Sequence, residues 1–349
     1  MINILEQVVL YCLSKLGKER SSSSVFHLLN GKKSSQTIQD SHLFQVESFF
    51  HTAHHLTREQ YESIISKLIK HEFIYFSSNQ QIVISESGQL LINELYSMYP
   101  FLKNLQGGKY HYCMQFWERL SLLIQVCSNQ VNKQTSYIPV QKNRDTQNWI
   151  KHLFATSVGN SKDFPCKLLK ELQSLLESSE LEVDPSVLVA RFSGFQSIGL
   201  TEMQTIEMLG IEENSYRFQF QALLHYLMRS IEENPSAYPL LARMAVTDEL
   251  HQLTASAKKT FELIKKGKGI VEIGRIRKLK ESTIQDHIVE IALFVNSFNI
   301  DRFVEEPLQD RIKEAIQKAS SKQLRKIREI IDVDYFQIRL VIAKFGDLL

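Results

Sequence analysis

The chain has 349 residues, of which 43% are hydrophobic, and its 41 Lys and Arg residues nearly balance 39 Asp and Glu residues. This length predicts two or three compact domains, and the near-zero net charge means that any attraction to a polyanion must come from a local patch. Scattered cysteines argue against a disulfide framework or a zinc knuckle, and the missing secretion signal and membrane-length apolar run lead us to expect a cytoplasmic protein.

The first hundred residues predict a winged helix. Apolar residues at helical spacing indicate one helix from Ile4 and another from Val25, and a Thr-x-x-Gln capping box at Thr57 opens a third. Two β-rich runs then follow at 73–76 and 82–84. Helices followed by a short hairpin are typical of this fold.

Two basic residues of the third helix, Lys67 and Lys70, are candidates for DNA contact. The hairpin tip at 77–81 carries no aromatic or Arg side chain that could stack on an opened base pair, so strand separation by this hairpin alone is not expected. The alternative is a winged helix that serves as a docking scaffold for another protein.

Residues 101–246 predict an all-helical middle region. Within it, the spacing from Leu200 to Tyr226 resembles the helix-turn-helix of sigma-factor region four, with Thr201 as the cap of the first helix and Gly210 in the turn. Ile206 departs from that pattern, because a bulky side chain at the crossing would push the helices apart. The alternative is an ordinary helical hairpin that ends its first helix at Gly210.

The segment from Lys266 to Ile288 predicts a helix-turn-helix in a last domain that begins at about Thr247. Ile270, Ile273 and Ile276 stand at helical spacing for the buried side of the first helix, and the second helix follows. Gly274 leaves room where two helices must nearly touch.

This segment is also locally basic. Between residues 257 and 288, nine Lys and Arg residues face four Asp and Glu residues. We expect phosphate-directed binding of DNA, with the polar residues at the start of the second helix assisting. The predicted nucleic-acid contacts here are Lys266, Lys268, Arg275, Arg277, Lys278, Lys280, Ser282, Thr283 and Gln285.

Two features weigh against a base-reading function for this segment. The second helix would expose Glu281, Asp286 and Glu290, and carboxylates repel phosphate. The turn also carries Lys278 where glycine is usual. Docking onto another protein and a purely structural helix pair therefore stay open as alternatives.

No motif of a catalytic site is present. The sequence has no phosphate-binding loop of the Walker type, no Gly-x-Ser-x-Gly and no His-Glu-x-x-His. His51-x-x-His54 has a spacing that a helix could present to a metal, but no further ligand set completes it beyond Glu47. We expect no enzyme activity, no metal, no cofactor and no small-molecule substrate.

Both ends of the chain resemble parts of RecQ-family helicases. Residues 257–303, with Glu272-Ile273-Gly274 and Ser282-Thr283-Ile284, resemble the helicase-associated helix-turn-helix domain, and residues 324–341 continue the likeness. Residues 25–88 look like the RecQ C-terminal winged helix, without its zinc-binding cysteines. Taken whole, the chain is similar to the YpbB-type helix-turn-helix proteins of bacilli, which are encoded beside a short RecQ-type helicase.

The resemblance implies an accessory protein for a helicase whose ATPase lies in another polypeptide. The expected fold is mainly α, with a winged helix at 1–100, a helical region at 101–246 and a helix-turn-helix domain at 247–349. The expected partners are DNA and a RecQ-family helicase in repair or recombination, with the protein at the nucleoid and not at a membrane. The alternatives are a sequence-specific transcription regulator and a protein-interaction adaptor that does not bind DNA.

Overall fold

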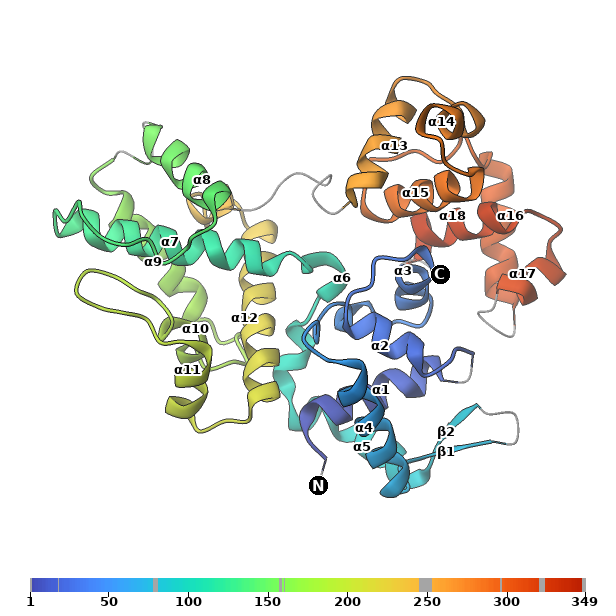
Figure 1. Ribbon diagram of the computed structural model, residues 1–349, viewed down its shortest axis with the longest axis horizontal. Coiled ribbons are helices and arrows are strands. Elements are labelled where there is room, and N and C mark those ends of the chain that lie inside the picture. Colours follow the sequence, from blue (N-terminus) through green and yellow to red (C-terminus); the bar gives the residue numbers. More distant parts are fainter. Residues whose placement is uncertain are drawn as a thin grey trace. The chain divides into compact units, whose positions relative to one another are not determined.

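The computed structural model describes residues 2–17, 19–77, 81–156, 159, 161–244, 253–295, 297–319 and 324–346, except for the side chain of Ser35. It is mainly helical and has one short β-hairpin, so the predicted fold class is confirmed (Figure 1). The chain divides into two compact units: unit 1 is Met1–Val8 with Leu90–Val246, and unit 2 is Val9–Gln89 with Thr247–Leu349. The three domain ranges expected from the sequence stay a prediction, and the boundary expected near 246 lies outside the described residues.

The N-terminal part of unit 2 has the helices and hairpin of a winged helix. Its elements are α1 (Ile4–Leu16), α2 (Ser23–Leu29), α3 (Ser35–Leu43), the 3-10 helix η1 (Glu47–Phe49), α4 (Arg58–Lys70), β1 (Ile74–Phe76), β2 (Ile82–Ile84) and α5 (Glu86–Met98), with α1 and α5 shared between the units. The capping box predicted at Thr57 is present, because its hydroxyl accepts from the Gln60 amide at 3.2 Å. The strands pair antiparallel with Ile74 opposite Ile84, and the tip at 78–80 lies outside the described residues.

The C-terminal part of unit 2 is built around one buried helix. Its elements are α13 (Ala255–Lys265), α14 (Ile270–Arg277), α15 (Glu281–Phe294), α16 (Glu306–Lys318), α17 (Leu324–Ile330) and α18 (Tyr335–Phe345). Helix α15 packs against both α13 and α18 (Figure 1), and Ile284, Ile288 and Ile291 are fully buried. The prediction that Ile276 is buried is wrong: its side chain is 53% exposed, because α14 turns only Ile273 and Gly274 fully inward.

The two parts of unit 2 meet through α3. This helix packs against α15 and α18. At the contact, Arg339 of α18 donates from Nη2 to Asp286 of α15 at 2.6 Å and from Nε to the Gln39 side chain of α3 at 3.3 Å. The side-chain amide of Gln39 in turn donates from Nε2 to the Arg339 backbone carbonyl oxygen at 3.2 Å. Helix α3 of the winged helix therefore covers a face of α15. In a solvent-exposed recognition helix, that face would be accessible to DNA.

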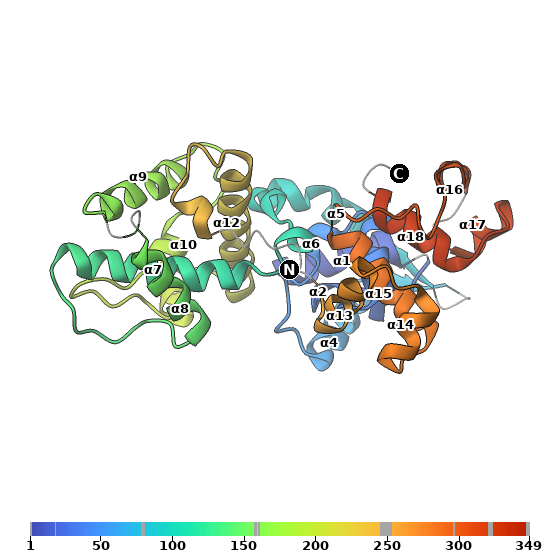
Figure 2. The ribbon, with the colours of Figure 1, turned by 90° about the horizontal axis from the view of Figure 1, so that it is seen from above.

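Unit 1 is helical and has its own core. Its remaining elements are η2 (Pro100–Asn104), α6 (Gly107–Tyr110), α7 (Cys113–Val131), α8 (Arg144–Ala155), α9 (Phe164–Leu176), α10 (Ser186–Val189), α11 (Glu202–Leu209), α12 (Glu213–Glu233) and η3 (Leu241–Met244). Helix α7 packs against α8, α9 and α12 (Figure 2), and the Trp117 ring lies 5.2 Å from the Phe220 ring between α7 and α12. Among the described residues, no helix has the length and apolar character needed to cross a bilayer.

Candidate nucleic-acid interface

The turn between α14 and α15 is tight and has a left-handed residue at its centre. Lys278 has φ +54 and ψ +43, its amide bonds to the Arg275 carbonyl at 3.3 Å, and the Leu279 amide bonds to the Gly274 carbonyl at 3.0 Å. These two bonds form the usual cap of a helix that ends in a left-handed residue. A Cβ atom at Gly274 would lie 3.0 Å from the Leu279 carbonyl oxygen. Glycine therefore avoids a tight contact with the backbone where the turn folds back over α14.

Three of the predicted basic contacts lie exposed in or beside this turn, and two more stand before the start of α14. Lys266, Arg275, Lys278 and Lys280 are exposed, and none of them forms an ion pair with another described residue. Lys268 differs, because its ammonium pairs with Glu272 one helical turn later. Backbone phosphates could therefore meet three unpaired cations at the turn and a fourth, Lys266, before α14. Lys268 could contact a phosphate if it left its ion pair with Glu272.

The first turn of α15 adds backbone donors to this surface. Lys280 occupies the N-cap position, but no side chain caps the first amides of the helix. Uncapped amides and the positive end of the helix dipole attract a phosphate. Ser282 is exposed beside them, whereas Thr283 and Gln285 are half-buried. Of the three polar residues predicted to contact DNA here, Ser282 is therefore the most accessible to a phosphate.

Arg277 has an intramolecular role. Its Nη1 donates to the Ser256 carbonyl oxygen at 2.7 Å and to the Thr260 hydroxyl, and its Nη2 donates to the Ser256 hydroxyl at 2.9 Å. These bonds tie the end of α14 to α13. The predicted phosphate contact of Arg277 does not fit this geometry, because most of its donors are already used. Sequence spacing gave no signal of this, since Arg277 stands in a run of exposed basic residues.

His287 of α15 lies beside this arginine. Its Nδ1 is 2.9 Å from the Thr260 hydroxyl and 3.3 Å from the Arg277 guanidinium. Burial, and after it the charge of Arg277, lowers the pKa of His287 below its usual value, although Asp286 acts in the opposite direction. The ring is therefore held in its neutral form at the junction of α13, α14 and α15.

Of the three carboxylates on α15 expected to repel DNA, one is buried, one forms an ion pair and one stays exposed. Glu290 is 7% exposed and accepts from the Thr254 amide at 2.5 Å, where it supports the start of α13. Burial raises the pKa of Glu290, and the hydrogen bonds from Thr254 act against that rise. Asp286 pairs with Arg339, so Glu281 is the exposed carboxylate left at the start of α15. The expectation that Glu290 is exposed is therefore wrong.

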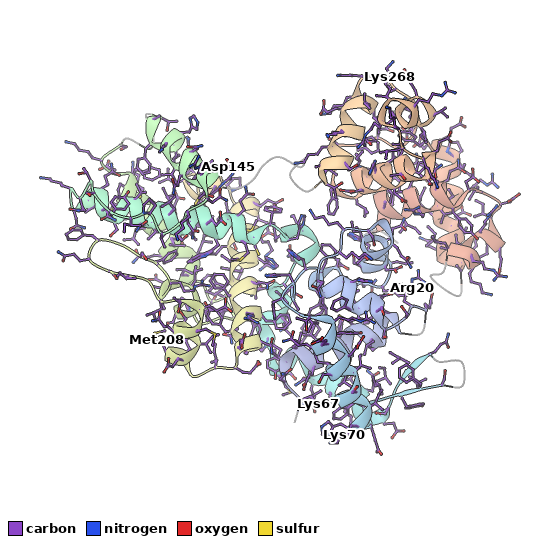
Figure 3. All side chains as sticks on the ribbon, in the orientation of Figure 1. Arg20, Lys67, Lys70, Asp145, Met208 and Lys268 are labelled. Atoms are coloured by element: carbon purple, nitrogen blue, oxygen red, sulfur yellow. The ribbon has the colours of Figure 1, made fainter. Side chains whose placement is uncertain are left out.

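The basic residues predicted on α4 lie elsewhere in unit 2. Lys70 is exposed and Lys67 half-buried, and both lie at the opposite end of this unit from Lys268 (Figure 3). The structure therefore does not bring them together with the basic turn. His51 and His54, the candidate metal pair, have ring centroids 5.2 Å apart, but His51 has φ +62 and lies in a turn, not in a helix. The described residues contain no group of three or more potential metal ligands.

The helix pair at 200–226 in unit 1 has the predicted local geometry but an acidic surface. Thr201 forms a capping box and Gly210 is left-handed with φ +63. The one basic residue near the turn, Arg217, is held by Glu202 at 2.8 Å and Glu213 at 2.5 Å. Unpaired phosphate-binding cations are missing from this turn in the described residues, which favours the helical hairpin over a DNA reader.

Comparison with known proteins agrees with this assignment of the C-terminal part. Residues 256–342 match the model of a family described as a helix-turn-helix domain. The whole chain is 33% identical over 351 residues to Protein YpbB of Bacillus subtilis (strain 168), and the alignment covers 98% of each chain. The chain belongs to the YpbB family. Within this YpbB-family chain, the helix-turn-helix match covers nearly all of α13, all of α14 to α17 and most of α18, so it includes the basic turn and supports DNA binding.

No solved structure matches the chain significantly. The match to YpbB does not test the resemblance between residues 25–88 and the winged helix of RecQ helicases. That resemblance stays a prediction. The uncapped start of α15 is the main feature that our interpretation of the sequence missed. It could have been found, because Lys280 stands where Ser, Thr, Asp or Asn would be expected before a helix.

Proposed function

We propose that this YpbB-family protein is a non-catalytic DNA-binding accessory protein that holds backbone phosphates at the turn between α14 and α15. Arg275, Lys278 and Lys280 supply the central cations, Lys266 and Lys268 extend them, and the first amides of α15 receive a phosphate oxygen. Arg277 positions α13 against α14 and does not contact DNA. The exposed, uncompensated charge of the turn supports this assignment.

One observation carries the proposal: two neighbouring lysines occupy positions where other residues would stabilise the fold better. Lys278 has a left-handed backbone, which glycine adopts without strain, and Lys280 is an N-cap residue without a capping side chain. Positions that depart from local preferences are often functional sites. Here both departures add positive charge to the same exposed turn.

The burial of α15 supports binding with little sequence preference. A recognition helix reads bases with an exposed face, but Val289 and Ile291 are fully buried and α3 packs against this helix. Only its first turns can approach a groove. We expect similar affinities for duplexes of unrelated sequence in fluorescence anisotropy, and a preference of a hundredfold or more for one duplex would instead favour a transcription regulator.

We further propose that the protein acts in the cytoplasm, at the nucleoid, and positions a RecQ-family helicase during repair or recombination. This part rests on the sequence resemblance of both ends of the chain to RecQ helicases. Binding of DNA by the accessory protein would raise the local concentration of a tethered helicase without new chemistry. Co-purification of a RecQ-type ATPase from nuclease-treated extract tests it, and retention of the ATPase only before nuclease treatment would contradict direct docking.

A further inference from the structure

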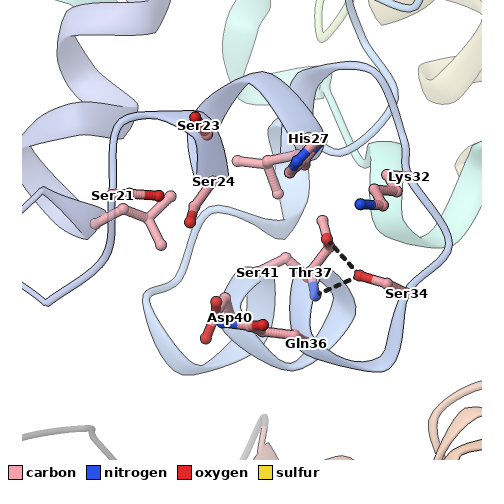
Figure 4. Close-up of a pocket in the computed structure, with 12 residues that line it drawn as sticks. Ser21, Ser23, Ser24, His27, Lys32, Ser34, Gln36, Thr37, Asp40 and Ser41 are labelled. Carbon is pink, nitrogen blue, oxygen red and sulfur yellow. Dashed lines mark hydrogen bonds between the residues drawn. The ribbon is translucent and has the colours of Figure 1, made fainter.

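A cavity of about 230 Å³ lies between α2 and α3 in unit 2 (Figure 4). Half of the residues that line it carry serine or threonine hydroxyls; Lys32, His27, Gln36 and Asp40 add further polar groups, and Leu16 and Leu28 contribute apolar wall. It is smaller than the roughly 300 to 1,000 Å³ typical of pockets for drug-sized ligands. Its size and polar walls suit a small, hydroxyl-rich ligand.

One side of the cavity gathers hydrogen-bond donors and positive charge. Lys32 and His27 extend toward the space beside Ser34 and Thr37 (Figure 4), whose hydroxyl oxygens lie 2.8 Å apart. Lys32 forms no ion pair with any described residue. One of these two hydroxyls donates to the other, so the pair keeps one proton, and this proton and the Lys32 ammonium can donate to the oxygens of a phosphoryl group.

The other side of the cavity offers an acceptor. Asp40 is 5% exposed, and its carboxylate accepts from Arg20 Nε at 2.9 Å and pairs with Arg20 Nη2 at 2.8 Å. Because Arg20 balances its charge, this carboxylate does not repel an anion strongly. A carboxylate has about four lone-pair positions, so it can still accept from a ligand hydroxyl.

The electrostatic environment of His27 agrees with an anion site. Burial lowers the pKa of His27, and the charges of Lys32 and Arg58 lower it further. A neutral imidazole among cations remains able to donate one hydrogen bond and to accept another. An anion bound beside it would oppose these charges and raise its pKa.

We propose that this cavity binds a small phosphorylated polyol, with the phosphoryl group held by Lys32, Ser34 and Thr37 and a ligand hydroxyl donating to Asp40. No residue of the basic turn lines the cavity, so its occupation can be tested separately from DNA binding. The ligand class follows from the lining: hydrogen-bond donors at one side suit a phosphoryl group, and the Asp40 carboxylate at the other side suits a ligand hydroxyl.

Titration of the full chain with inorganic phosphate and with ribose 5-phosphate tests the proposal. The readout is the NMR pH titration of His27, assigned by its loss in His27→Gln. Both probes should raise the His27 pKa, and ribose 5-phosphate should bind more tightly because its hydroxyls reach Asp40. Lys32→Gln should weaken both probes about tenfold or more. The matched control is Lys33→Gln, which removes the neighbouring charge outside the cavity lining and should leave both affinities unchanged.

Absence of a His27 shift with either probe up to about 10 mM would overturn the proposal. If Lys32→Gln and Lys33→Gln weakened the binding of the probes equally, general surface charge would explain the binding. That result would also overturn the proposal. Equal affinity for the two probes would remove the role of Asp40. A His27 shift with duplex DNA but with neither small probe would assign the cavity to nucleic acid. Loss of DNA binding in variants of the basic turn would leave the phosphate titration unchanged, so the two proposals fail separately.

Discussion

Arg277 Nη1 donates to the carbonyl oxygen of Ser256 at 2.7 Å, and this bond fixes the end of α14 against the first turn of α13. The same guanidinium satisfies the fully buried hydroxyl of Thr260. We expect Arg277→Ala to lower the free energy of unfolding by about 2 kcal/mol, because hydrogen bonds to a charged group are lost and a buried hydroxyl loses a partner. Urea unfolding of the full chain, followed by circular dichroism, measures this change.

Arg275→Ala is the control for this variant, since Arg275 is exposed on the same helix and forms no ion pair with a described residue. It should leave stability within about 0.5 kcal/mol of the parent and weaken DNA binding. The reverse result, with Arg277→Ala stable and less able to bind DNA, would make Arg277 a phosphate contact after all.

The pH dependence of stability should reveal His287. The pKa of His287 in the folded chain lies below its ordinary value of 6.5. At a pH between the folded-state pKa and 6.5, the folded chain therefore binds fewer protons at this residue than the unfolded chain does. The stabilisation from neutral His287 is fully present above pH 6.5 and is lost as the pH falls toward the folded-state pKa. Thermal unfolding at pH 5 to 8 should show this loss, and His287→Gln should reduce the slope. An unchanged slope in the variant would rule out His287 as its source.

Two substitutions in the basic turn should stabilise the fold while they weaken DNA binding. Lys278→Gly relieves a left-handed lysine and should add about 0.5 to 1 kcal/mol after allowance for the freer unfolded chain. Lys280→Ser supplies the missing cap of α15 and should add about 1 kcal/mol. Thermal unfolding and anisotropy measure the two effects on the same samples. Loss of stability in both variants would show that these lysines serve the fold.

Gly274 should not tolerate alanine. Its Cβ would lie 3.0 Å from the backbone oxygen of Leu279, which cannot rotate away as a side chain can. We expect Gly274→Ala to cost about 1 to 3 kcal/mol. Gly269→Ala is the matched control, because no atom lies within 4 Å of its added Cβ and its φ is −87. Equal unfolding midpoints for the two variants would contradict the close contact between the turn and α14.

Local patterns in the sequence predicted much of the fold. The capping box at Thr57, the helix cap at Thr201 and the left-handed Gly210 depend on a few neighbouring residues, and the structure has all three. Apolar spacing likewise predicted the helix-turn-helix and the small residue at Gly274. Such features are visible in one sequence because the interacting groups lie within a few positions of each other.

The candidate site was harder to predict, because contacts with other segments of the chain decide which of its charged side chains are exposed and which are paired or buried. Asp286 and Glu290 have the spacing of exposed residues, but Arg339 pairs with one and the start of α13 buries the other. Arg277 stands among exposed cations, yet it alone of them bonds to α13. Asp286 is paired from α18, and α3 also packs against α15; both helices stand far from Asp286 in the chain.

The central claim, that the α14–α15 turn holds DNA phosphates, is tested most directly by the salt dependence of duplex binding. The variant combines Arg275→Ala, Lys278→Gly and Lys280→Ser; the charge-matched control combines Lys318→Ala, Arg325→Ala and Lys326→Ala, whose side chains pair with acids on α16 and α17. The slope of log K against log salt should become shallower by about 2 to 3 in the turn variant and stay near the parent value in the control. A parent slope in the turn variant, or the same loss in both, would contradict the claim.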